Sequence, residues 1–239
     1  MERCSAYVIV SEGSSERAYI QQLRSFLANK MPVADDFRSR LDLIPKVTNN
    51  GAGGGQFALV QQTYRKCRKA DKRTPIMVWV DADIYVRNEG VVEERNAKSY
   101  AGKKSLPDFL FSVMNFEDFL ALHFDDDIFE KWYEAFSPQH FKVPMHGSQH
   151  MPIFVKIWQE HANRNSCKPY SKGDLPSGFI SLHSLKNLMR HISDPRIIAL
   201  FRANTPTETF AEFLVSKIRT LYAEPFADFN NKQEGQLHG

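Results

Sequence analysis

The first half of the chain alternates short apolar runs with stretches in which apolar residues recur at helical spacing. Short runs rich in β-formers and followed by polar residues are typical of buried strands. Apolar residues three and four positions apart are typical of a helix with one face on the core. The pattern predicts strands at residues 5–10, 41–47 and 76–80, separated by helices at residues 14–27 and 57–69. Pro45 marks the middle strand as an edge strand or a strand end.

The pattern then changes from alternation to helices alone. A polar stretch at residues 88–104 is expected to be helical, and it leads to a fourth strand candidate at residues 109–114. After Phe124 the expected helices are residues 126–136, 153–163, 182–191 and 207–221, separated by clusters of Pro, Gly and Ser at residues 137–152 and 165–180.

Strands joined by helical crossovers form parallel sheets, because the crossovers cover both faces. The predicted fold class is therefore α/β, with a mostly parallel sheet flanked by helices and a helical C-terminal extension. We expect the sheet in residues 1–124 and the helical region in residues 125–239, with a disordered tail after about residue 225.

Composition narrows the class of protein without identifying a partner. With 42% hydrophobic and 25% charged residues, the chain of 239 residues is expected to fold and bury a sizeable core. Its three cysteines form no CxxC pair, which argues against a disulfide framework and favours the cytoplasm. No apolar stretch reaches the ~18 residues of a membrane span, so no membrane association is expected. The net charge of +3 carries little weight by itself.

Acidic residues follow two of the predicted strands directly. Glu12 follows the first strand, Glu16 lies one helical turn later, and Asp81 and Asp83 follow the strand at residues 76–80. Since the carboxyl ends of parallel strands share one edge, these side chains are expected to converge there. Converging carboxylates repel each other unless a hard cation binds them, and oxygen-only ligands favour Mg²⁺ or Mn²⁺. An Asp-x-Asp pair alone would more often be a turn or helix cap, but all these acidic positions together favour a metal site.

Two of these segments resemble a known family. Residues 8–19, VIVSEGSSERAY, are similar to the glutamate motif of TOPRIM domains, and residues 78–83, VWVDAD, are similar to their DxD motif. Within that superfamily the chain most resembles the RloB-like proteins and the nuclease half of OLD (overcoming lysogenization defect) proteins. Residues 115–124, NFEDFLALHF, resemble a further motif of this group but lack its Pro-Cys pair and its Trp, and residues 169–172, PYSK, resemble its Tyr-x-Lys element.

The resemblance implies a Mg²⁺-dependent or Mn²⁺-dependent nuclease that cleaves phosphodiester bonds in DNA or RNA, often in defence against phages and mobile elements. It implies Glu12, Asp81 and Asp83 as catalytic residues that also bind metal. Glu117 is either a further metal ligand or an acidic residue favoured in the first turn of a helix. Lys172 either stabilises charge on the transferred phosphate or is a solvated surface lysine.

A basic helix face suggests a place for the nucleic acid. Arg65, Lys66, Arg68 and Lys69 can follow a phosphodiester backbone, although such faces are usually only solvated. An ATPase or another defence protein, and a second copy of the chain, remain open as partners. The alternative function is a non-catalytic module that keeps the TOPRIM fold and binds nucleic acid or a partner protein. His123, among apolar neighbours, is interpreted as a packed core residue.

Overall fold

The computed structural model describes residues 8–11, 13–30, 46–50, 57–70, 72, 74–81, 108–112, 115–136, 145, 147–204 and 208–221. The expected helix at residues 88–104, the tail after residue 225, and the acidic residues Glu12 and Asp83 lie outside these ranges. Within them, strands and helices alternate from β1 to β3, β4 is the next described element, and only helices follow it.

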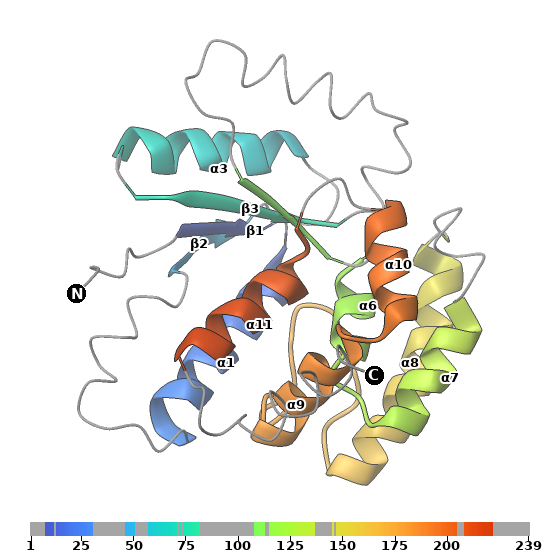
Figure 1. The fold of residues 1–239 in the computed structure, drawn as a ribbon. Helices are drawn as coiled ribbons and strands as arrows, with labels where there is room; N and C mark the ends of the chain where they lie inside the picture. The colour runs from blue at the N-terminus through green and yellow to red at the C-terminus, as the bar shows by residue number, and fades with distance from the viewer. Residues whose placement is uncertain are drawn as a thin grey trace, which may run out of the picture.

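One sheet contains four strands: β1 (Val8–Ser11), β2 (Lys46–Asn50), β3 (Ile76–Val80) and β4 (Asp108–Phe111). Every neighbouring pair is parallel, and the spatial order is β2-β1-β3-β4. Helix α3 (Phe57–Ala70) covers one face of the sheet, while α1 (Ser14–Lys30) and α11 (Phe210–Leu221) lie on the other (Figure 1). The expected parallel sheet with helices on both faces is therefore confirmed.

The direction of chain travel across the sheet reverses between β1 and β3. From β1 the chain passes to β2 on one side and then returns to β3 on the other side of β1. Ligands of open α/β sheets bind outside the carboxyl ends of the strands at such a reversal. Ser11, which ends β1, pairs with Trp79 near the end of β3, so the two central strands end at the same level.

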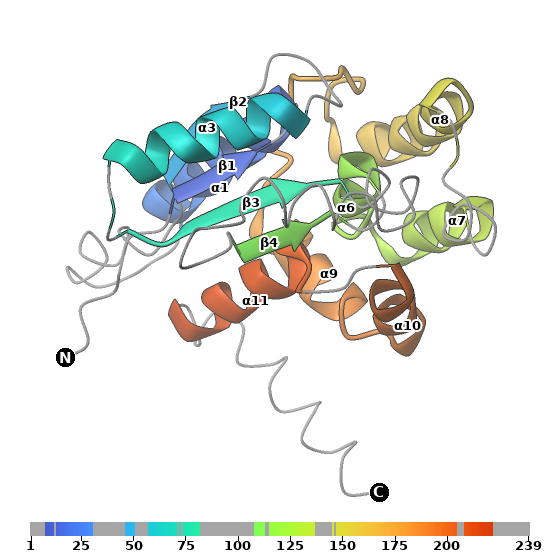
Figure 2. The same cartoon turned by 90° about the horizontal axis from the view of Figure 1, so that it is seen from above.

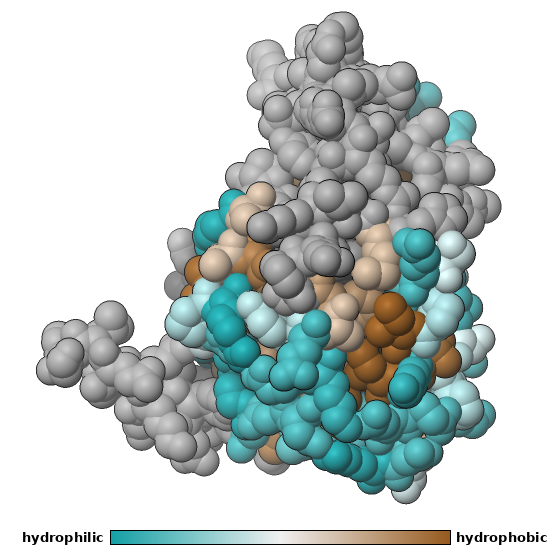
Figure 3. Space-filling model, turned by 90° about the vertical axis from the view of Figure 1, so that its right-hand side faces the viewer, coloured by the Kyte–Doolittle hydropathy of each residue, from teal (hydrophilic) through white to brown (hydrophobic). Residues whose placement is uncertain are grey.

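The residues after β4 form helices α6 (Phe116–Ala121), α7 (Asp126–Phe136), α8 (Gly147–Asn165), α9 (Leu182–His191) and α10 (Pro195–Asn204), which precede α11. Helices α6, α7, α8 and α10 lie beyond the carboxyl ends of β3 and β4 (Figures 1 and 2). Seen from that side, the coloured part of the surface is mostly hydrophilic, with apolar residues showing between the hydrophilic ones (Figure 3). No helix in the described ranges is long and apolar enough to cross a membrane.

One hydrophobic core joins the sheet to the helical region. The ring of Trp79 stacks on Phe210 of α11 with 3.6 Å between centroids, and its Nε1 donates to Ser112 Oγ at 3.0 Å. Tyr19 of α1 meets Phe119 of α6 edge to face at 4.8 Å. Such aromatic pairs contribute about 0.5–1.5 kcal/mol beyond the burial of their area. Helices α1, α6 and α11 are therefore held against the end of β3.

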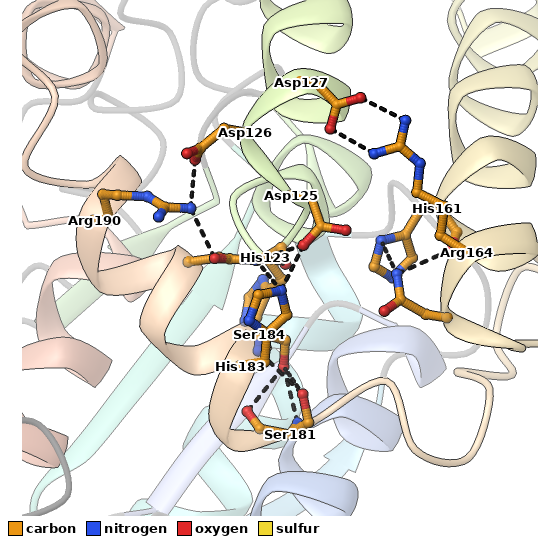
Figure 4. Close-up of polar contacts among 12 residues, drawn as sticks. His123, Asp125, Asp126, Asp127, His161, Arg164, Ser181, His183, Ser184 and Arg190 are labelled. Atoms are coloured by element: carbon orange, nitrogen blue, oxygen red, sulfur yellow. Dashed lines mark hydrogen bonds and ion pairs between the residues drawn. The ribbon is translucent and has the colours of Figure 1, made fainter.

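Three consecutive aspartates at the start of α7 connect it to the helices that follow (Figure 4). They contact side chains of α8 and α9. Among the six side chains of these pairs only Asp125 is less than 40% exposed, so solvent screens the pairs and each contributes little to stability. Their main effect is to fix how the three helices sit against each other. The pairs are Asp125 with His183, Asp126 with Arg190, and Asp127 with Arg164.

Helix α8 corrects one sequence expectation. Gly147 and Ser148 were expected to lie in a break before the helix, but α8 begins at Gly147 and contains Pro152. Glycine and serine are acceptable here because the first N–H groups of a helix have no acceptor inside it. Pro152, near the start, removes only one further hydrogen bond, and burial of Phe154 and Trp158 on the core side offsets that loss.

Candidate functional site

Glu16 lies in the first turn of α1, shortly after the end of β1. Its side chain is buried, with 4% of its surface exposed. A Cβ atom added at Gly13 would lie 2.9 Å from Glu16 Oε2, so the carboxylate packs closely against the backbone of the β1–α1 turn. A negative charge is favoured there because the dipole and the first N–H groups of the helix attract it. The local sequence thereby places a carboxylate at the carboxyl edge of the sheet.

Asp81 follows β3 directly and is half-buried, with its Oδ1 atom buried. Because Ser11 pairs with Trp79, Asp81 lies at the level of the turn that follows β1. The acidic segments that follow β1 and β3 therefore begin at the ends of neighbouring parallel strands.

Glu117 lies in the first turn of α6 and is buried, with 6% of its surface exposed. The start of α6 is fixed by a capping box in which Asn115 Oδ1 accepts from Asp118 N at 3.1 Å and Asp118 Oδ2 accepts from Asn115 N at 3.3 Å. Asp118 is also fully buried, and its Oδ1 accepts from Trp132 Nε1 at 2.9 Å. The cap fixes the start of α6 and therefore the place from which the Glu117 side chain begins.

Tyr170, in the loop between α8 and α9, connects these carboxylates. Its hydroxyl donates to Glu117 Oε1 at 2.7 Å. Burial raises the pKa of the Tyr170 hydroxyl far above its usual value, and the negative charges of Glu117, Glu16 and Asp81 raise it further. Three carboxylates from three separate elements therefore lie close enough to act on one hydroxyl, and that hydroxyl keeps its proton.

Lys172 lies at the tip of a tight turn in the same loop. Ser171 O accepts from Asp174 N at 3.1 Å, and Gly173 has a φ of +86°, a conformation that favours glycine. Gly173 N donates to Ser15 Oγ in the first turn of α1 at 2.9 Å. The backbone on both sides of the exposed Lys172 is thus held beside the segment that carries Glu16.

The basic residues of α3 lie toward the opposite edge of the sheet. Arg68 donates to Thr74 O at 3.2 Å, and Thr74 precedes β3 whereas Asp81 follows it. A strand of five residues spans about 16 Å, which separates Arg68 from the carboxylates. The structure therefore does not bring the following expected nucleic-acid-binding residues to the carboxylate edge: Arg65, Lys66, Arg68 and Lys69.

The donor set at the carboxylate edge consists of oxygen atoms only, which fits a hard divalent cation better than zinc. In the parts of the chain that the structure describes, no three His, Cys, Asp or Glu side chains lie close enough together to hold a metal ion. A complete ligand set here would need Glu12 or Asp83, both outside those parts. Glu16, Asp81 and Glu117 thus lie at the same edge of the sheet, but these three described carboxylates do not by themselves form a metal site.

Comparison with known proteins adds no assignment. No family model, no curated protein and no solved structure matches the chain.

The sequence pattern assigns no role to Tyr170, although this residue belongs to the segment PYSK that resembles the Tyr-x-Lys element. The spacing of Tyr170 and Lys172, two residues apart in one loop, was the available signal. The contact with Glu117 could not be read from the sequence, because it depends on how the loop packs against α6.

Proposed function

We propose that this protein is a metal-dependent nuclease of the TOPRIM type, resembling RloB-like and OLD proteins, that hydrolyses phosphodiester bonds in DNA or RNA. The observation that supports this most is the placement of Glu16, Asp81 and Glu117 at the carboxyl edge of the sheet, where the Tyr170 hydroxyl donates to Glu117 Oε1. Carboxylates gathered in this way repel each other, and a divalent cation is the usual means of stabilising them.

The motif resemblance and the geometry support the proposal from separate directions. The resemblance concerns three stretches of sequence around Glu16, Asp81 and Glu117, which are far apart in the chain. The fold brings the three residues to one edge, at the reversal point between β1 and β3 where ligands of open α/β sheets bind. A set of unrelated caps and turn residues would have no reason to converge there.

In this proposal Glu16, Asp81 and Glu117, with Glu12 and Asp83, hold Mg²⁺ or Mn²⁺. The ion, when bound, polarises the phosphoryl group and lowers the pKa of a bound water. The chain supplies the orientation of the carboxylates through β1, β3 and the capped start of α6. The remaining elements of the proposal are a cytoplasmic location, a role in defence against phages or mobile elements, and an ATPase or other defence protein as candidate partner.

Cleavage assays test the proposal. The purified protein is incubated with a panel of single-stranded and double-stranded DNA and RNA in Mg²⁺, in Mn²⁺ or in EDTA. We expect cleavage only with metal, and Asp81→Asn and Glu16→Gln should lower its rate by at least about 100-fold because each removes a charge that the ion needs. Asp127→Asn is the matched control, because it makes the same chemical change at an exposed carboxylate of α7.

Cleavage at the wild-type rate by folded Asp81→Asn and Glu16→Gln proteins would overturn the assignment of the site. Tight binding of nucleic acid with no cleavage by the wild-type protein under any metal condition would instead favour the non-catalytic module.

Lys172 is proposed to stabilise negative charge on the phosphate oxygens, since the backbone next to it is held at the start of α1, where Gly173 N donates to Ser15 Oγ. We expect Lys172→Ala to lower kcat by about 10-fold or more with little change in KM, because charge that develops in the transition state affects kcat. Lys172→Arg should restore part of the rate.

The matched control is Lys168→Ala, an exposed lysine of the same loop whose carbonyl, rather than its side chain, contacts Trp158. Equal rates for wild type and Lys172→Ala would remove Lys172 from the site.

A further inference from the structure

The position of the Tyr170 ring is fixed by helix α8. Its ring packs edge to face on Phe154, with 5.1 Å between centroids, and lies 5.3 Å from Trp158. Both of these α8 residues are fully buried. The hydroxyl therefore reaches Glu117 from a rigid support, although the two residues are 53 positions apart in the chain.

A hydrogen bond at this point has a strong effect on a glutamate. The last torsion of a glutamate side chain is broad, so a carboxylate without a fixed partner rotates over a wide range. A short hydrogen bond to Oε1 restricts that rotation and fixes the direction of Oε2. Because Glu117 is 6% exposed, competition from water is weak and the restriction is correspondingly strong.

The donor role of Tyr170 follows from the hydrogen bond itself. The hydroxyl donates to Glu117 Oε1 at 2.7 Å, because an ionised carboxylate can only accept. A neutral hydroxyl adds no negative charge beside Glu117.

We propose that Tyr170 is a positioning residue, whose hydroxyl orients the Glu117 carboxylate toward the divalent cation of the proposed site. This inference rests on the proposed function in one respect, the binding of a cation at the carboxylate edge. Tyr170 acts through Glu117, in the manner of the outer partners that hold metal-binding carboxylates in other proteins.

The experiment measures Mn²⁺ binding to the full-length protein by electron paramagnetic resonance, in which bound Mn²⁺ loses its free-ion signal. The variants are Tyr170→Phe, Glu117→Gln and the double variant. Phenylalanine keeps the ring that packs on Phe154 and removes only the hydroxyl, so the fold should persist. Near-ultraviolet circular dichroism and thermal unfolding check this.

We expect Tyr170→Phe to weaken Mn²⁺ binding by about 10-fold, the lower end of the range for such partners. In the double variant, loss of the hydroxyl should add little to the effect of Glu117→Gln, because Tyr170 acts through Glu117. Tyr133→Phe is the matched control, since this half-buried tyrosine of α7 lies against Arg196 and not at the carboxylate edge.

Each result separates this inference from the proposed function. If wild type and Tyr170→Phe bind Mn²⁺ equally, the positioning role is wrong and the metal site stands. If the two substitutions weaken binding independently and their effects multiply, Tyr170 does not act through Glu117 and the inference is again wrong. If wild type binds no Mn²⁺ at millimolar concentration, the proposed function fails, and the positioning role fails with it.

Discussion

His123 is a fully buried histidine whose protonation is controlled by the protein interior. Its Nε2 lies 2.8 Å from Tyr19 Oη, and its Nδ1 lies 3.3 Å from Phe119 O. Burial lowers the pKa of His123 to about 3, so the imidazole is neutral at physiological pH. The interpretation of His123 as a packed, hydrogen-bonded core residue is confirmed.

We expect the free energy of unfolding to fall as the pH drops below about 6.5. In the unfolded chain His123 binds a proton near its ordinary pKa of about 6.5, whereas the folded protein binds it only near pH 3. Between these values the unfolded state carries more protons, so acid destabilises the fold, by about 2 kcal/mol from pH 6.5 to pH 5 for His123. His161, with a pKa lowered by burial to about 4, acts in the same direction. Urea unfolding at pH 7 and pH 5 measures the change.

The pH dependence should be weaker in His123→Gln, which has no imidazole to protonate at this position. Tyr19→Phe is the control, since it removes the same side-chain hydrogen bond but keeps the titrating group. Its pH dependence should match that of wild type. Equal pH dependence in wild type and His123→Gln would contradict the role given to burial.

At the scale of elements, the short helix α6 serves two parts of the molecule at once. Glu117 faces the loop after α8 and accepts from Tyr170, whereas its neighbour Asp118 binds Trp132 of α7 and lies 3.1 Å from His150 of α8. The capping box therefore does more than begin a helix. It fixes one carboxylate in the helical core and, through the same turn, aims the next one at the candidate site.

Local signals predicted most of the described elements but missed helix α10. Helix α9 was expected with the observed bounds Leu182–His191, because its apolar residues have clear helical spacing and Ser181 caps it. Helix α10 was not expected, although Asp194 accepts from Arg196 N at 2.8 Å and Pro195 is a favourable first residue. The sequence expectations place no element between residues 191 and 207.

At the scale of the whole molecule, the sequence predicts the sheet better than it predicts the site. Strand-ending acidic residues indicated where Glu16 and Asp81 would lie, because strand direction alone decides which edge they share. The basic residues of α3 were assigned from their common face, but a crossover helix runs antiparallel to the strands. Arg68 therefore ends beside Thr74, at the far edge. The contact between Glu117 and Tyr170 needed the packing of the loop, which no local pattern contains.

The turn that carries Lys172 allows opening of the loop between α8 and α9 to be measured with a protease. Lys172 is an exposed residue of the kind after which trypsin cuts, but the chain around it is tied to α1 through Ser15 and through Gln22, whose Nε2 donates to Pro176 O at 3.0 Å. A protease needs this chain released from its neighbours, so the rate of cutting reports how often the loop opens.

We expect Ser15→Ala, which removes the acceptor for Gly173 N, to be cut faster than wild type between Lys172 and Gly173. Gly173→Ala should be cut faster still, because its Cβ would lie 2.8 Å from Ser14 Oγ at a positive φ. Ser25→Ala, on an exposed part of α1, is the control, and mass spectrometry of the fragments identifies the cut. Cutting at the same rate in all these proteins would mean that the loop is not held through α1. Faster cutting of the variants would mean that the rate of digestion measures how stably the loop between α8 and α9 is held against α1.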